Sequence, residues 1–585
     1  MAPVDERNII RPVGTLAKFN TSRHSLGLIR SVIVICRYNV PLTRLYNARL
    51  SSNSSPGTSL PDVLMPLLEH ALASVIHDQP ILGVGIAGED TSDPAFVLVE
   101  QIDMRRMLEW RELRPPDAAA EGGVQMNGEE EEEEEREKAY ENLLLRCLET
   151  YHERSWEDLA SKPGWKVIVH HDSRQLDIWH SHRAHHEDST VDSESHSTSL
   201  CLSLDISFCF HHGYADGRSA YIFHRDLLRA LNYQLNSSTN VHPAVPLLQG
   251  HILHISKPPA ISPPMEDLIP FTMSWGFILS MVWREVLYPL LKPFFRIIQS
   301  KRDGEDRDAL PWTGAPIDPS NPKMHIRMVR VGSSDRDLEA ILARCRGHNA
   351  SLTGLIHALA SASSSFKPGE TMHSLVTSLT VHHDVDAIKA LVFQSKKGAR
   401  EVFEDVEEKE EDQEATAAVW TFAAEMTARL RSRAKTLPRD DILALAGLVG
   451  DWHAFMRAKF GKEREATWEL SNLGSLSAED AGFAPISDPD TNTDSDTSSI
   501  DADRKTDNRG TWVIDRAIFT QGPLPLGAAM NVNVAGVAPG TGREKGVGNV
   551  IITVTWQDGI VETELMDGLA KDLEMWLTEI GKARS

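Results

Sequence analysis

The chain has 585 residues, of which 41% are hydrophobic and 25% are charged, the composition of a globular protein with room for two or three domains. Its net charge of −24 argues against a nucleic-acid-binding protein, which needs a basic surface for the phosphates. The five cysteines are too few and too scattered for a disulfide framework or a zinc site, and the N-terminus lacks the apolar segment of a secretory signal.

Three acidic stretches interrupt the chain. Glu129–Glu135 is an unbroken run of seven glutamates, a second stretch spans Glu404–Glu414, and Asp488–Asp507 is rich in Asp, Ser and Thr. Runs of like charge repel themselves and stay solvated. We therefore predict disordered insertions at about 115–138, 397–415 and 484–510.

The N-terminal half alternates strand and helix patterns. The clearest is Leu200–His211, in which apolar residues alternate with small or polar ones at the period of a β-strand. A helix is predicted from Arg218 to about Leu231. Pro66 lies inside another predicted helix, whose regular part we expect to begin there. The other predicted strands are Ser31–Cys36, Ile81–Ile86, Ala95–Val99, Val167–Val169 and Leu176–Ile178, and the other helices are 59–76 and Tyr140–Leu159.

A proline-rich connection is predicted at 255–322. Within it, Phe271–Ile298 is rich in Trp, Phe, Leu and Met, and its longest apolar run, Phe271–Trp283, is shorter than the ~20 residues that span a membrane. A helical hairpin packed across the two halves and a helix lying on a membrane surface both fit this composition. We expect a cytoplasmic protein, with peripheral attachment to the endoplasmic reticulum or a lipid droplet as the alternative.

The C-terminal half also contains both strand and helix patterns. The predicted strands are Ile326–Val331, Leu375–Val381 and Ala517–Val537, followed by a hairpin of Val550–Trp556 and Ile560–Leu565 around the Asp558-Gly559 turn. The predicted helices are Asp337–Arg346, Leu352–Ser363, Thr416–Ala434, Ile442–Lys459 and one that starts near Asp567. These elements predict an α/β protein with an N-terminal lobe at 1–254, a connection at 255–322 and a C-terminal lobe at 323–585.

Two sequence patterns are rejected as functional motifs. Gly83, Gly85 and Gly88 match GxGxxG, but an acidic turn follows them instead of the helix that a dinucleotide site requires. Several histidines cluster in the chain, and His180 and His182 would share one face of a strand, but no fixed ligand spacing completes a metal site. That cluster comprises His170, His171, His180, His182, His185, His186 and His196.

The strand at Leu200–His211 ends in the sequence His211-His212-Gly213-Tyr214-Ala215-Asp216-Gly217. A histidine pair at the end of an apolar strand is typical of a loop that builds a ligand site. The spacing allows Asp216 to fix the surroundings of the histidines, and Gly217 would permit a positive φ. A neutral histidine held there could act as a general base near pH 7.

This loop resembles the HHxxxDG signature of CoA-dependent acyltransferases, which include chloramphenicol acetyltransferase and peptide-synthetase condensation domains. The chain as a whole is more similar to the fungal alcohol acetyltransferases. The residues that carry this resemblance are Arg11–Gly14, Leu26–Leu28, Arg37-Tyr38, His77–Leu82, Trp312–Gly314, Leu352–Gly354, Ser471–Gly474 and Gly548–Trp556. The DFGWG motif of the plant BAHD enzymes is absent.

The resemblance implies a chloramphenicol-acetyltransferase-like fold, with two α/β lobes and a tunnel between them. His212 aligns with the general base, and Asp216 with a structural aspartate that usually holds an arginine. Gly213 and Gly217 belong to the loop, and His211 flanks the site. Ser471 and Asn472 match a short motif that would line the tunnel.

The function implied is acetyl or other acyl transfer from acyl-CoA to a small alcohol by a monomer, with no covalent acyl-enzyme and no metal. N-acylation of a long-chain amine or acylation of a secondary metabolite would use the same base and tunnel. A degenerate homologue that acts as an interaction protein is the non-enzymatic alternative.

Overall fold

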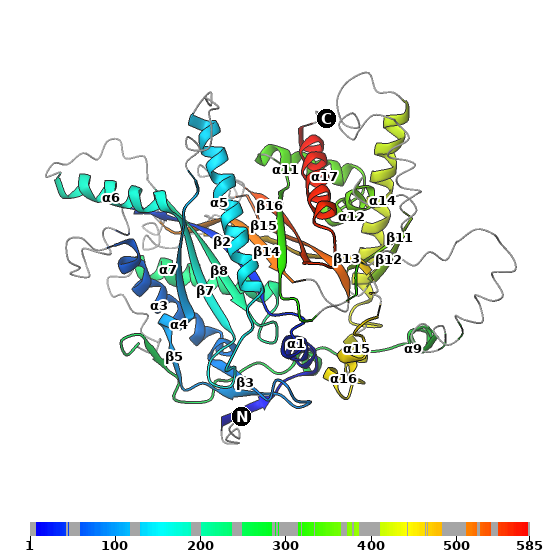
Figure 1. Ribbon diagram of the computed structural model, residues 1–585, viewed down its shortest axis with the longest axis horizontal. Helices are drawn as coiled ribbons and strands as arrows, with labels where there is room; N and C mark the ends of the chain where they lie inside the picture. Colours follow the sequence, from blue (N-terminus) through cyan, green and yellow to red (C-terminus); the bar gives the residue numbers. More distant parts are fainter. Residues whose placement is uncertain are drawn as a thin grey trace, which may run out of the picture.

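Two β-sheets, each covered by helices, form the two lobes of the protein, as the computed structural model shows in Figure 1. The structure describes residues 8–582 except 43–44, 46–58, 117–128, 189–200, 237–247, 284–286, 288–290, 292–313, 317–318, 333, 364–370, 377–378, 385–409, 442, 463, 465, 483–510, 523–526 and 540–547. The predicted insertion at 484–510, most of that at 397–415 and half of that at 115–138 therefore lie outside the described residues. No helix in the described ranges is long and apolar enough to cross a membrane.

The N-terminal sheet has five strands in the order β14-β2-β8-β7-β6. Their bounds are Val513–Gln521, Val32–Pro41, Cys201–Phe210, Trp165–Asp172 and Leu108–Leu113. Helices α3 (Leu60–Asp78) and α7 (Gly217–Asn236) pack on one face, and α5 (Glu129–His152) covers the other. The apolar residues of β8 from Leu202 to Phe210 face α3 and α7, so the prediction of this strand from its period of two is confirmed.

The chain crosses between the lobes at β14. This strand comes late in the sequence, yet it pairs antiparallel with β2 of the N-terminal sheet, with Ile518 opposite Ile35. The next strand, β15 (Ala528–Val537), lies in the other sheet. The predicted strand region Ala517–Val537 is thus two strands in two sheets, and the lobes are not separate stretches of chain.

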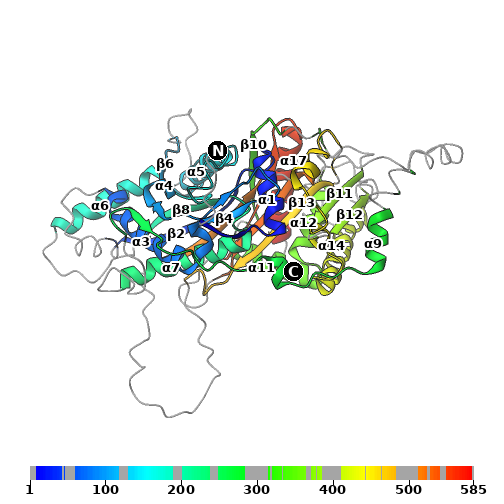
Figure 2. The same cartoon turned by 90° about the horizontal axis from the view of Figure 1, so that it is seen from below.

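The C-terminal sheet has six strands in the order β10-β16-β15-β13-β11-β12. The bounds not yet given are Met324–Arg330, Asn549–Gln557, Ala466–Leu476, Thr371–Val376 and Leu379–Asp384. Four helices build the core of this lobe with the sheet, and they are α11 (Asp335–Gly347), α12 (Leu352–Ala362), α14 (Glu410–Thr436) and α17 (Thr563–Lys582). Figure 2 shows these helices gathered beside the sheet, away from α3 and α7.

The predicted C-terminal hairpin is wrong. After β16 the chain turns at Asp558 and Gly559 and enters α17 at Thr563, where the sequence prediction placed a second strand. The apolar residues of α17 recur at helical spacing and bury one face in the C-terminal core. That longer periodic run outweighs the short apolar pair Ile560-Val561.

The glutamate run is helical where the structure describes it, so the prediction of disorder there is wrong. It forms the first turns of α5, whose later residues Tyr140, Leu144 and Leu148 anchor the helix in a core between the two sheets. Arginines compensate the acidic side chains: Glu133 pairs with Arg174 at 2.6 Å. Residues 410–415 of the second acidic stretch likewise form the start of α14.

Four buried or half-buried side chains continue this ion network into the sheet. Arg516 of β14 contacts Asp205 of β8 at 3.1 Å and also pairs with Glu141 of α5. Arg37 of β2 pairs with the same Asp205 at 2.9 Å. Burial alone would raise the pKa of Asp205, but the two guanidinium groups hold it far below its usual value. The network therefore fastens α5 to three strands.

Several smaller predictions need correction. Leu176–Ile178 lies in α6 (Ser173–Asp188), which Asp172 starts by accepting the backbone N–H of Arg174 at 3.0 Å, so His180 and His182 stand on a helix. Helix α3 is regular from Leu60 because Ser59 and Asp62 form a capping box, and Pro66 is tolerated within it. The predicted helix Ile442–Lys459 is two short ones, α15 (Leu443–Ala446) and α16 (Trp452–Arg457), separated by a segment that contains Gly447 and Gly450.

The remaining elements are short and pack around the sheets. Ile81–Ile86 begins as the 3₁₀ turn η2 (Pro80–Gly83), and Leu375–Val381 spans the two strands β11 and β12. The other elements are β1 (Ile9–Pro12), α1 (Thr15–Ser25), β3 (Val84–Ala87), β4 (Ala95–Leu98), β5 (Gln101–Asp103), α4 (Met104–Met107), β9 (Ile252–His254), α8 (Met265–Leu268) and α9 (Trp275–Val282).

Candidate active site

The HHxxxDG residues form a tight loop between β8 and α7. Strand β8 delivers His211 into the interior, where its side chain is fully buried, and its backbone N–H donates to Gly164 O at 2.8 Å. The backbone N–H of Tyr214 then donates back to His211 O at 3.0 Å. The side chains of His211 and His212 point in different directions, because successive residues at the end of a strand face opposite sides of the sheet.

His212 has the arrangement of a general base. Its Nδ1 lies 3.0 Å from the carbonyl oxygen of Ala215. A carbonyl can only accept, so Nδ1 carries the proton and Nε2 keeps a free lone pair. Burial and the nearby Arg23 guanidinium lower the pKa of His212 to about 4, against the opposing effect of the Ala215 bond. The imidazole is therefore neutral at physiological pH.

Helix α1 forms one wall of the loop, and its residues were not identified from the sequence. Asn20 donates from Nδ2 to His212 O at 3.1 Å and accepts a bond from the buried Arg23. Arg23 interacts electrostatically with Glu469 of β13, and burial raises the pKa of Glu469 to about 7. A polar chain from His212 through Asn20 and Arg23 thus reaches the strand of the other lobe.

His211 belongs to a second group of residues, behind His212. The carboxylate Oε1 of Glu89 lies 2.7 Å from His211 Nε2 and 2.8 Å from His24 Nδ1. The far nitrogens of both rings accept backbone N–H groups: Gly213 donates to His211 Nδ1 at 2.8 Å and Trp156 donates to His24 Nε2 at 3.0 Å. We call His24, Glu89 and His211 the Glu89 triad.

The hydrogen bonds of the Glu89 triad fix its protons. Because each far nitrogen accepts an N–H, each near nitrogen carries the proton and donates it to Glu89. Burial would raise the pKa of Glu89, but the bonds from His211 and His24 outweigh it and lower the pKa to about 2. The three side chains have the spacing of a metal-ligand set. Protons, however, occupy the two imidazole positions that a metal would need.

Gly213 and Gly217 lie at positions where a side chain would collide with its neighbours. A Cβ on Gly213 would lie 2.8 Å from the ring of His211, and one on Gly217 would lie 2.4 Å from Leu473 Cδ2 of β13. The expectation that Gly217 supplies a positive φ is wrong, because it is the first residue of α7 and is not among the glycines with positive φ.

Asp216 caps the start of α7. Its Oδ1 accepts both the backbone N–H and the hydroxyl of Ser219, each at 2.7 Å. Among the described residues its hydrogen-bonded partner is this serine, where the resemblance implied an arginine. The carboxylate is exposed and lies at the helix end where a negative charge is favourable.

Helix α7 also ties the loop to the C-terminal sheet. Arg218 donates to Leu473 O at 2.7 Å, and the Tyr221 hydroxyl bonds to Gly474 O and to Gly536 N and O. Ser471 and Asn472 precede this contact on β13, where Asn472 donates to Thr353 Oγ1 at 3.0 Å. They therefore lie next to the contact between β13 and α7, but they are not among the residues that line the cavity at His212.

That cavity has a volume of about 480 Å³ and is lined by both apolar and polar side chains. Phe96, Phe208 and Ile222 contribute apolar surface, while Asn20 and Ser219 contribute polar atoms. This volume is within the usual range for a small-molecule site, and His212 stands in its lining. The sequence predicted this histidine, but not the walls around it.

Comparison with known proteins gives relatives over nearly the whole chain, although no family model matches it. The probable alcohol acetyltransferase FCK4 of Fusarium pseudograminearum is 26% identical over 585 residues, covering 98% of this chain and 96% of that protein. The probable alcohol acetyltransferase crmB of Aspergillus fumigatus is 21% identical over 569 residues, covering 94% and 96%.

Among solved structures, the trichothecene 15-O-acetyltransferase TRI3 of Fusarium sporotrichioides superposes with a TM-score of 0.50 and 11% identity, covering 97% of this chain and 94% of that one. The protein thus has the two-lobed α/β fold of the CoA-dependent acyltransferases, as predicted. The predicted similarity of its sequence to the fungal alcohol acetyltransferases is confirmed.

Proposed function

We propose that the protein transfers an acyl group, such as acetyl, from acyl-CoA to the hydroxyl of an alcohol, with His212 as the general base. The observation that carries this proposal is the bond between His212 Nδ1 and Ala215 O at 3.0 Å, which leaves Nε2 unprotonated in the lining of a cavity. The names of the similar fungal proteins support the reaction class and the alcohol acceptor.

The reaction balances without a covalent acyl-enzyme. His212 Nε2 takes the proton of the acceptor hydroxyl while the oxygen forms a bond to the thioester carbonyl carbon. The tetrahedral intermediate then collapses, the carbon–sulfur bond breaks, and the imidazolium returns its proton to the leaving thiolate. The ester and free CoA are the products. Asn20 and the Glu89 triad hold the loop while the base changes charge.

The first test measures thiol release from acetyl-CoA with a panel of alcohols and amines. We expect acceptor-dependent release by the wild type and a loss of about 10²–10⁴-fold in His212→Ala, the usual contribution of a positioned base. His180→Ala removes an exposed histidine of α6 and serves as the matched control. Activity that survives in His212→Ala would remove this residue from its role, and turnover of amines alone would favour N-acylation.

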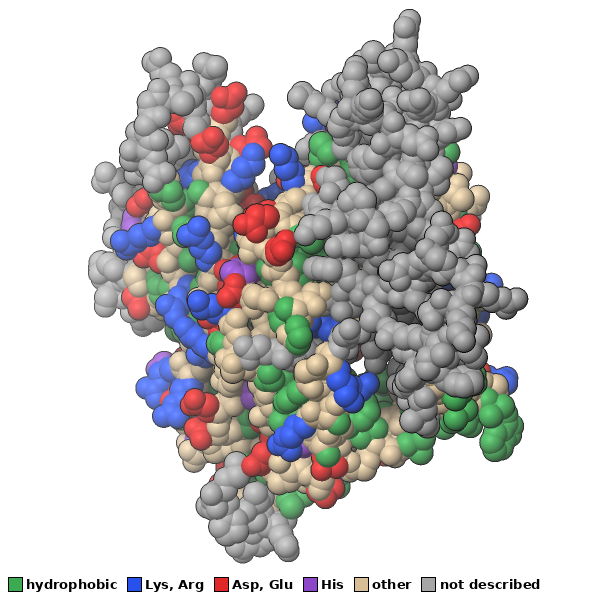
Figure 3. All heavy atoms as spheres, turned by 45° about the vertical axis from the view of Figure 1, so that its right-hand side comes forward, with side chains coloured by type: hydrophobic (Ala, Val, Ile, Leu, Met, Phe, Trp, Pro, Cys, Tyr) green, Lys and Arg blue, Asp and Glu red, His purple; other side chains and the backbone are tan. Residues whose placement is uncertain are grey.

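A monomer that contacts a membrane surface through α9 is part of this proposal. Trp275, Leu279 and Val282 of this helix are exposed by 80%, 66% and 41%, and Figure 3 shows hydrophobic side chains at the lower right, where α9 lies. Ser274 caps α9 and bonds to Asp440, so the helix is fastened at its start while its apolar face stays open. A cytoplasmic enzyme with such a helix would meet lipophilic acceptors at a lipid surface.

A further inference from the structure

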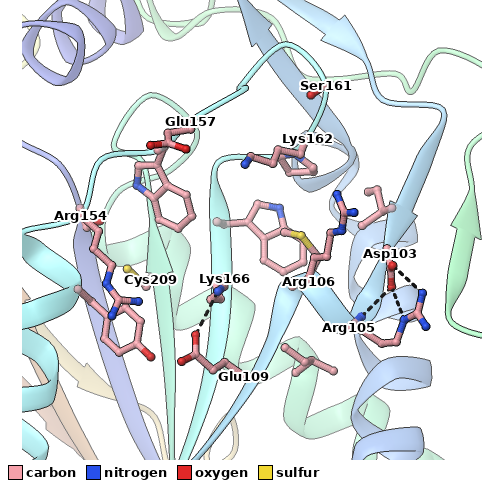
Figure 4. A pocket seen from close by; sticks show the side chains of 18 of the residues that line it. Asp103, Arg105, Arg106, Glu109, Arg154, Glu157, Ser161, Lys162, Lys166 and Cys209 are labelled. Carbon is pink, nitrogen blue, oxygen red and sulfur yellow. Dashed lines mark hydrogen bonds and ion pairs between the residues drawn. The ribbon is translucent and has the colours of Figure 1, made fainter.

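A second cavity, larger than the one at His212, lies on the opposite face of the N-terminal sheet, beneath the C-terminal end of α5. Its volume is about 800 Å³, and we call it the basic cavity. Arg106 comes from α4, Arg154 follows α5, Lys162 lies in the next loop, and Lys166 lies on β7. Figure 4 shows these four cationic side chains arranged around the opening.

The charges of the basic cavity are only partly balanced. Its lining holds the cations Arg105, Arg106, Arg154, Lys162 and Lys166 and the carboxylates Asp103, Glu109 and Glu157. Asp103 is occupied by Arg105 at 2.8 Å, and Glu109 by Lys166 at 3.1 Å. Among the described residues, Arg106 and Arg154 have no ion pair. With Glu157 counted, the five cations of the lining still exceed its three carboxylates, in a chain whose net charge is −24.

Two further contacts organise the wall of the cavity. The guanidinium of Arg154 lies over the ring of Tyr151, 5.0 Å from its centroid, which orients a side chain that is otherwise exposed. The half-buried Trp156 is held by a bond from its Nε1 to Arg30 O at 2.9 Å. The lining therefore combines guanidinium groups, of which that of Arg154 is held in place and which suit phosphate oxygens, with an indole that offers a flat apolar surface.

We propose that the basic cavity binds a phosphate-bearing ligand of nucleotide size, with Arg106 and Arg154 contacting the phosphates. Its volume suits such a ligand. The ligand has two chemical sources: the phosphoadenosine end of acyl-CoA, in which case the inference rests on the proposed function, or a separate phosphate ester. Trp156 links the cavity to the site, because its backbone N–H donates to His24 of the Glu89 triad.

Calorimetry with adenosine 3′,5′-bisphosphate as the probe tests this proposal without any need for turnover. We expect the wild type to bind the probe, and Arg106→Ala/Arg154→Ala to bind it at least ~10-fold more weakly because two charge-assisted contacts are lost. The control Arg429→Ala/Arg431→Ala removes two exposed arginines of α14 in the other lobe, so that total charge is matched. His212→Ala should bind the probe as the wild type does.

Competition by CoA distinguishes the two sources. If the ligand is the nucleotide end of the donor, CoA displaces the probe, and the double variant raises KM for acetyl-CoA but not for acetyl-pantetheine, which lacks phosphates. If it is a separate ligand, CoA leaves the probe bound. No binding, or equal binding by the wild type and Arg106→Ala/Arg154→Ala, would overturn the proposal.

Discussion

At the scale of single residues, His212 determines how the rate depends on pH. Its pKa is lowered to about 4, so the imidazole is a competent base at any higher pH and becomes protonated only below this value. We expect kcat/KM to stay flat between pH 6 and 9, with no inflection near 6.5. Initial rates at a low concentration of acetyl-CoA measure this.

Glu469 provides the control for that profile. Burial raises the pKa of Glu469 to about 7, and Glu469 reaches the loop only through Arg23, so any inflection near neutral pH has to be assigned either to Glu469 or to His212. The profile should therefore be measured in Glu469→Gln as well. An inflection near 6.5 that persists in this variant would show that His212 titrates like a solvated histidine.

Glu89 is a positioning residue, and two substitutions of it should have different effects on the rate. Glu89→Gln keeps a carbonyl oxygen that accepts both imidazole N–H groups, and we expect kcat within ~3-fold of the wild type. Glu89→Leu leaves two buried donors without an acceptor, which costs about 2–4 kcal/mol of folding free energy and should lower kcat more than KM. Denaturant unfolding and steady-state kinetics on the same samples test this.

A metal-binding role for the triad would give a different result. A zinc ion needs the charge of the carboxylate, so Glu89→Gln would then lose as much activity as Glu89→Leu, and a chelator would inactivate the wild type. Equal losses in the two variants would therefore contradict the proton assignment derived from Gly213 and Trp156.

At the scale of elements, the contact between α7 and β13 determines how the lobes meet. Gly217→Ala would place a methyl group against Leu473, and we expect a loss of about 1–3 kcal/mol from overpacking. Leu473→Ala in the same chain frees that space. The double variant should therefore lose less stability than the two single variants lose together. A double-mutant cycle measured by thermal or denaturant unfolding would test this. Additive losses would indicate that the two residues do not touch.

The sequence predicted the elements with strong periods and missed those without one. Strand β8 and its histidine loop are continuous in sequence, so the pattern and the motif reinforced each other. Helix α1 buries Asn20, Arg23 and His24, and no apolar stripe marks it as a wall of the site. Glu89 was read as part of an acidic turn, because nothing local shows that it meets a histidine 122 residues later.

The prediction that the glutamate run is disordered is wrong for a similar reason. Its local chemistry favours disorder, but Arg174 of α6 pairs with Glu133 of the run, and Arg516 of β14 pairs with Glu141 further along the same helix. The prediction of a C-terminal hairpin is wrong because it gave the Asp558-Gly559 turn more weight than the longer helical spacing of the apolar residues in α17. Local patterns predict elements well, but partners that are remote in sequence decide whether charged segments are ordered.

At the scale of the whole molecule, the exposed apolar side chains of α9 predict that the protein binds to a membrane surface. Figure 1 shows α9 at the far edge of the C-terminal half, away from both sheets. We expect flotation with zwitterionic phosphatidylcholine vesicles, lost in Trp275→Ser/Leu279→Ser and retained in Ile9→Ser, which alters an exposed apolar residue of β1. If the double variant floats as the wild type does, α9 is not the contact.

The crossing of β14 has a consequence for how the protein is made. Strand β2 emerges early from the ribosome, but the strand that pairs with its edge is nearly 500 residues further on. Until β14 arrives, the N-terminal sheet has an unpaired edge next to a buried core, a surface prone to aggregate. A fragment that stops before Val513 should therefore be insoluble by itself, and separately expressed halves should become soluble only when they are produced together.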